Sequence, residues 1–138
     1  MKRRISLCSI AIAAAAIWLF ATPAHANGRN ELTYFTFSAP VELPGVALPA
    51  GTYMFKHPDV NDRQVVQVFS QDGQTVYGTF LTIPESRVNP AESPTVTFEE
   101  TPRGTPEAIK AWFYPGRTTG QEFIYPEEQA AKLAEASR

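Results

Sequence analysis

The 138-residue chain contains 12 Lys and Arg against 14 Asp and Glu, which gives a formal net charge of −2 at pH 7. Hydrophobic residues make up 43% of the chain and aromatic residues 12%, and the basic residues form no continuous stripe. Nucleic acid is therefore not an expected partner.

Residues 1–26 are predicted to be a cleaved signal peptide. Three basic residues at positions 2–4 precede an almost unbroken apolar run over residues 5–20, and Ala24-His25-Ala26 provides the small residues of a cleavage site. A retained N-terminal anchor is the alternative, but the run is short for a bilayer span. We expect cleavage after Ala26 and a location in the periplasm or outside the cell, with no stable membrane span left.

Residues 27–138 are predicted to form a single β-rich domain. Removing the three basic residues of the signal leaves nine Lys and Arg against 14 Asp and Glu, a net charge of about −5. The only cysteine, Cys8, lies in the signal, so no disulfide can form in this domain. It must be held together by its hydrophobic core.

The first half of the domain contains the clearest turn signal. Strands are predicted over residues 32–38 and 52–56, and the three prolines in residues 39–49 favour an edge strand or an extended crossing. After a polar loop over residues 57–63, Asp72-Gly73 predicts a two-residue type I′ hairpin in which both residues need a positive φ. The pairs expected across that hairpin are Phe69 with Val76, Val65 with Phe80, Val68 with Tyr77, and Val66 with Thr79.

The second half is expected to contain a loop over residues 84–94, strands over 95–100 and 122–125, and a helix from Pro126. Seven to eight short strands with turn signals about every ten residues predict an antiparallel β-sandwich or small barrel with a short C-terminal helix.

The strand that begins at Ala108 is the densest aromatic run of the chain. Regular alternation would place Ile109, Ala111 and Phe113 in the core and turn the intervening side chains to the other face. That second face has two interpretations. It is either a binding platform for a sugar ring or peptide, or it is covered by the C-terminal helix or the proline-rich loop. The second interpretation is favoured, and the residues of the speculative platform and its rim are Lys110, Trp112, Tyr114 and Arg117.

Several segments are similar to a group of small exported bacterial proteins that have no assigned activity. The resemblance rests on Leu48–Tyr53, Gly78–Leu81, Ile109–Gly116 and Glu122–Pro126, and covers most of residues 27–138. It implies a bacterial envelope or secreted protein, and it assigns a role to no residue.

No catalytic, metal or cofactor motif is found. His57 is the one histidine after the signal, and the segment from Asp59 to Asp62 lacks the glycine and distal glutamate of a calcium loop, so its acidic residues are expected to solvate and start a turn. Glu99 and Glu100 would point to opposite faces of a regular strand.

The sequence therefore predicts a non-catalytic β-domain that binds a small ligand or an envelope protein. The alternative is an enzyme that acts on an envelope glycan through Asp and Glu carboxylates. Two carboxyl groups facing one cleft, roughly 5–10 Å apart, would favour the enzyme.

Overall fold

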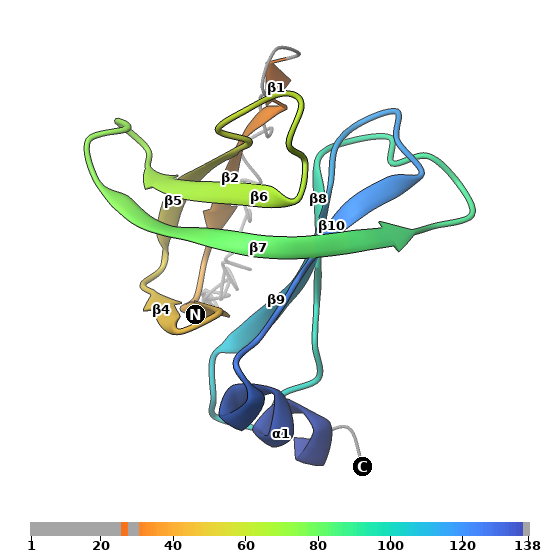
Figure 1. Ribbon diagram of the computed structural model, residues 1–138. Helices are drawn as coiled ribbons and strands as arrows, with labels where there is room; N and C mark the ends of the chain where they lie inside the picture. Colours follow the sequence, from red (N-terminus) through yellow and green to blue (C-terminus); the bar gives the residue numbers. More distant parts are fainter. Residues whose placement is uncertain (1–25, 28–30, 137–138) are drawn as a thin grey trace, which may run out of the picture.

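The computed structural model describes residues 26–27 and 31–136, which form ten strands and one helix (Figure 1). The predicted signal peptide lies outside the described residues, apart from Ala26. The strands are β1 (Ala26–Asn27), β2 (Leu32–Phe37), β3 (Val41–Leu43), β4 (Val46–Leu48), β5 (Gly51–Lys56), β6 (Val65–Ser70), β7 (Val76–Ser86), β8 (Thr95–Phe98), β9 (Glu107–Phe113) and β10 (Thr119–Phe123), and the helix is α1 (Glu127–Ala136).

The strands pair in the order β1-β2-β5-β6-β7-β10-β9-β3-β4. Strand β8 lies outside this order and pairs with β9 along the edge opposite to β10. All of these pairs are antiparallel except β3 with β9. The 11-residue strand β7 pairs with β6 over its first half and with β10 over its second half, so it runs across both halves of the molecule (Figure 1). The expected all-β fold, a sandwich or small barrel with a C-terminal helix, is confirmed.

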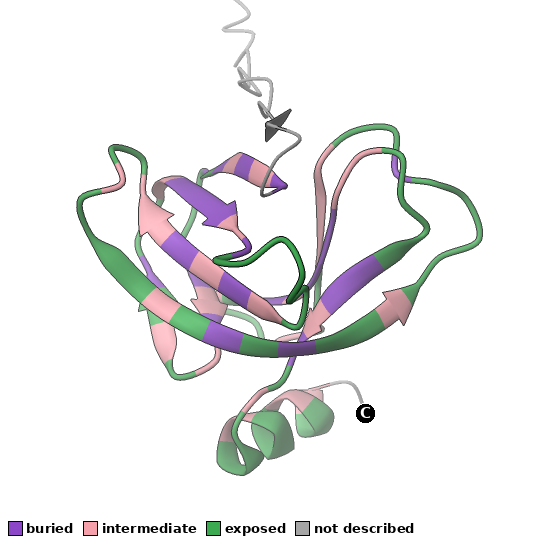
Figure 2. Ribbon diagram, turned by 45° about the horizontal axis from the view of Figure 1, so that its top comes forward, coloured by how far each residue is buried: buried purple, intermediate pink, exposed green. Residues whose placement is uncertain are grey.

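The core lies between the strands on the β6 side of β7 and those on its β10 side. Phe55, Val66 and Val68 from β5 and β6 pack in one cluster with Trp112 and Phe123 from β9 and β10, and all five are buried. Figure 2 shows buried stretches alternating with exposed ones along the strands. Burial of such large apolar side chains is the main favourable term in folding. No residue of α1 is buried, so the helix adds little to this core.

The turn between β6 and β7 is longer than the sequence predicts. Gly73 has a φ of 74°, as expected, but Asp72 is not in the positive-φ region. The Gly73 amide donates to the Ser70 carbonyl at 2.9 Å, and the Ser70 amide donates to the Thr75 carbonyl at 2.8 Å. Residues 71–74 therefore form a four-residue loop, in which only the glycine takes the left-handed conformation.

The register of this hairpin is only partly the predicted one. Phe69 pairs with Val76, as expected, but the register shifts by one residue beyond that pair. Val66 rather than Val65 is consequently opposite Phe80. A β-bulge causes the shift, because one extra residue in β7 is accommodated without a partner.

Two element boundaries differ from the predicted ones, and one agrees. β7 continues through Pro84 to Ser86, where a loop was expected, and β10 begins at Thr119, three residues early. The helix follows Pro126, as predicted, and the Pro126 carbonyl accepts its first hydrogen bond, from Ala130, at 2.8 Å. No helix in residues 26–27 and 31–136 is long and apolar enough to cross a membrane.

Candidate functional site

Strand β9 does not alternate regularly. Its register with β8 shifts between Thr97 and Phe98, and Lys110 is the extra residue on β9. Such a bulge reverses the side-chain alternation beyond it. Ile109 and Trp112, three positions apart, therefore pack in the same core cluster. Ile109, Ala111 and Phe113 are all buried, as predicted, but only Ala111 and Phe113 share a cluster, and the predicted placement of Ile109 on their face is wrong.

Trp112 is fully buried, as the favoured interpretation of this face predicts, and the alternative, an exposed aromatic platform, is not present. Its indole packs against the His57 ring, with centroids 5.1 Å apart, and against Phe55, with centroids 6.1 Å apart. Tyr114 is half-buried and packs on the same core. The C-terminal helix, which was one of the two expected covers, does not cover Trp112. The side chains that pack on its ring are those of Phe55 in β5 and of His57, the residue after β5.

The remaining two predicted site residues form ion pairs in different places. Lys110 Nζ lies 3.1 Å from Glu85 Oε1, and this hydrogen bond raises the pKa of Lys110. Arg117 Nε lies 2.6 Å from Glu31 Oε1. Arg117 thus belongs to a charge cluster around Glu31, whereas Lys110 pairs with a glutamate of β7.

The Glu31 cluster joins three separate segments of the chain. The Glu31 carboxylate is buried, with 6% of its side chain exposed, and it contacts Arg63, Arg117 and His57. Arg63 Nη1 donates to Oε1, and His57 Nε2 lies 3.3 Å from Oε2. Glu31 also has a φ of 50°, a conformation that most residues avoid and that surrounding contacts must maintain.

The charges around Glu31 decide its ionisation. Burial raises the pKa of this carboxyl group. The side-chain contacts of His57 and Arg63 and the charge of Arg117 lower the pKa by more than burial raises it, so the net shift is downward. Glu31 is therefore ionised at neutral pH and is not suited to act as a general acid. Its arrangement is that of a structural anchor, because cations from two loops converge on one buried anion.

His57 was expected in a solvated loop, and that expectation is wrong. The ring is 1% exposed, and its Nδ1 lies 2.8 Å from the Val65 carbonyl, which can only accept, so Nδ1 carries a proton. The acidic residues that follow do start turns as predicted. Asp59 Oδ1 accepts from the Asn61 amide at 2.9 Å, and no metal-binding group of three or more ligands occurs in the described residues.

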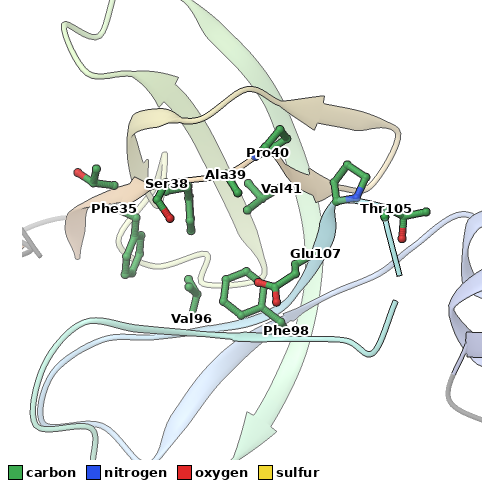
Figure 3. A pocket seen from close by; sticks show the side chains of 13 residues that line it. Phe35, Ser38, Ala39, Pro40, Val41, Val96, Phe98, Thr105 and Glu107 are labelled. Atoms are coloured by element: carbon green, nitrogen blue, oxygen red, sulfur yellow. The ribbon is translucent and has the colours of Figure 1, made fainter. Parts of the chain in front are cut away.

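The fold also forms an open apolar groove that no pattern in the sequence predicts (Figure 3). We call it the phenylalanine groove. Its volume is about 760 Å³, within the usual range for ligand sites. One wall is formed by β2 and the segment leading into β3, and the other by β8 and the segment before β9. The residues used below are Phe35, Phe37, Val96, Phe98 and Glu107.

The phenylalanine groove combines rigid aromatic walls with few polar groups. Phe37 and Phe98 are in edge-to-face contact across it, with ring centroids 6.4 Å apart, and Phe35 stacks beside Phe37 at 6.2 Å. Phe98 is 39% exposed, so its ring is available to an occupant. Glu107 is the one charged side chain in the lining.

A second hollow, of about 900 Å³, lies between α1 and the β3–β4 hairpin. Charged side chains of Glu42, Glu128, Lys132 and Glu135 line it. Gln129 of the helical wall accepts a hydrogen bond from the Gly45 amide through its Oε1 at 3.0 Å. The phenylalanine groove is the better-defined site, because a strand of the sheet contributes to each of its walls.

Comparison with known proteins returned no similarity. No protein-family model, no curated protein and no solved structure matches the chain.

Proposed function

We propose that this chain is an exported bacterial protein whose β-domain binds a ligand or a partner segment in the phenylalanine groove, without catalysing a reaction. The groove itself is the observation that supports this function. Its walls are mainly apolar and include aromatic side chains from the paired strands β2 and β8, and the Phe98 ring is partly exposed in it. A concave apolar site with a few polar groups is the usual form of a binding site.

The alternative, a glycan-acting enzyme, has less support. Hydrolysis of a glycosidic bond requires two carboxyl groups flanking the substrate, one of them with a raised pKa. The phenylalanine groove is lined by a single carboxylate, Glu107. The buried carboxylate of Glu31 has a lowered pKa and is held by cations.

Titration with a neutral apolar dye, N-phenyl-1-naphthylamine, tests binding in the groove. The dye's fluorescence should increase with the wild-type protein, and Phe98→Ser should weaken its binding about tenfold, because a large exposed aromatic contact is lost. Val88→Ser is the matched control, since Val88 is 94% exposed and lies outside the groove. Equal binding by wild type and Phe98→Ser would contradict the proposed function.

Export is tested separately. Intact-mass analysis of the protein secreted from, or released from the periplasm of, a bacterial host should give a species that begins at Asn27. A full-length species in the membrane fraction would contradict cleavage and favour a retained anchor.

A further inference from the structure

The free edge of β8 lies along the phenylalanine groove. The Glu99 amide donates to the Ala108 carbonyl of β9 at 2.8 Å. Backbone groups of successive residues in a strand point to alternate edges, so the N–H and C=O of Phe98 point away from β9, and those of Val96 do so as well. The bulge does not interrupt this pattern, because its extra residue is on β9. Within the described residues, β8 pairs with no strand but β9.

The same two residues also direct their side chains into the groove. Val96 and Phe98 both line it, opposite Phe35 of β2 (Figure 3), and Phe98 contacts Phe37 of the same strand. A strand placed beside β8 would therefore gain main-chain hydrogen bonds from the edge. Every second side chain of that strand would face the apolar wall of β2. A small apolar molecule could use the wall but would leave these main-chain donors and acceptors without partners.

The charge of the groove limits which strand it suits. Glu107 is exposed, and it is the only charged residue in the lining. No ion pair of Glu107 is present among the described residues. An occupant with a Lys or Arg near one end would complement this carboxylate, and the excess of acidic over basic residues in the chain acts in the same direction.

We propose that the phenylalanine groove binds an extended polypeptide segment, which adds to the edge of β8, places alternate apolar side chains against Phe35 and Phe37, and carries a basic residue that pairs with Glu107. This inference rests on the proposed function and specifies its ligand class.

The test uses the full chain and an array of synthetic hexapeptides with Val, Ile or Phe at alternate positions and Lys or Arg at either end. Fluorescence polarisation should identify peptides whose binding weakens at least tenfold when alternate amides of the peptide are N-methylated. N-methylation retains the side chains and removes the main-chain hydrogen bonds along one edge. Equal affinity of a peptide and its N-methylated copies, with either set of alternate amides blocked, would overturn the inference.

A variant tests the edge from the protein side. Val96→Pro removes a donor that points away from β9, a position where edge strands tolerate proline, and should weaken peptide binding at least tenfold. Val96→Ala trims the side chain, retains the donor, and should weaken it less. Glu107→Gln should weaken binding of the Lys- or Arg-containing peptides and not of versions with Gln in that place. Equal binding by Val96→Pro and wild type would overturn the inference.

Hydrogen exchange keeps the inference testable if Val96→Pro does not fold. On peptide binding to the wild-type chain, amide exchange at Val96 and Phe98 should slow at least tenfold, while the Thr97 amide, which faces β9, changes less. If the apolar dye binds in the groove but no peptide of the array does, the strand-addition inference fails and the proposed function stands. If neither binds, both fail.

Discussion

The imidazole ring of His57 is stacked on the indole of Trp112, with centroids 5.1 Å apart and planes inclined by 26°. The same imidazole places Nε2 3.3 Å from the Glu31 carboxylate. His57 therefore connects the buried charge cluster to the largest side chain of the core. Substitutions in the cluster should consequently affect the stability of the whole domain.

Glu31→Gln should lower the free energy of unfolding at pH 7 by about 3 kcal/mol, because it removes the buried anion that pairs with two arginines. Arg63 and Arg117 are 42% and 45% exposed and can still reach water, which limits the loss. Urea denaturation measures it. Glu128→Gln, on the exposed surface of α1, is the control and should change stability little.

The effect of Glu31 should depend on pH. The folded-state pKa of Glu31 lies below its ordinary value of 4.5. A group whose pKa is lower in the folded state stabilises the protein above its unfolded-state pKa, and this contribution disappears as the pH falls through the folded-state pKa. The stability difference between wild type and Glu31→Gln should thus be largest above about pH 5 and shrink in more acidic solution. A difference that stays constant down to pH 2 would contradict the ionised state of Glu31.

Removing residues 127–138 should leave Trp112 buried, because Phe55 and His57 cover its ring and no residue of α1 is buried. The measurement is tryptophan emission and acrylamide quenching in a Trp18→Phe background, in which Trp112 is the only tryptophan. Both should match the untruncated chain. A red-shifted, readily quenched emission after truncation would show that the helix protects the ring.

Gly73→Ala should destabilise the β6–β7 hairpin by about 1–2 kcal/mol, because a Cβ is penalised at the φ of 74° that Gly73 adopts. Gly51→Ala is a matched control, since Gly51 is outside the positive-φ region and a Cβ there would make only ordinary contacts. Thermal unfolding distinguishes the two variants. Equal melting temperatures would mean that the turn does not constrain Gly73.

Gly120→Ala should cost about 2 kcal/mol or more. A Cβ at this position would lie 2.5 Å from the Trp112 carbonyl oxygen and 2.6 Å from the Phe113 ring, and the backbone oxygen cannot move independently. Thr119→Ala, at the exposed start of β10, is the control. A fully stable Gly120→Ala would show that β9 and β10 can separate at this point.

Local patterns in the sequence were sufficient to predict the elements that depend on the backbone preferences of single residues. The helix after Pro126, the β6–β7 hairpin and its Phe69–Val76 pair were predicted, because proline and glycine restrict φ wherever they occur. The sequence was insufficient beyond the bulges in β7 and β9. A bulge shifts every later pair by one residue, and which residue it contains is decided by packing on both faces of the sheet.

The sequence by itself determined the all-β class and the alternation of apolar residues that makes a core. Only the tertiary structure decided the two sites. Glu31, Arg117 and the loop that carries His57 and Arg63 come from three separate segments of the chain, so their convergence on one buried carboxylate requires the folded sheet. The phenylalanine groove likewise depends on β2 and β8, which pair with different neighbours and face each other only when β7 joins the two halves. Contacts of this kind depend on the relative placement of whole strands, which periodicity within a strand does not specify.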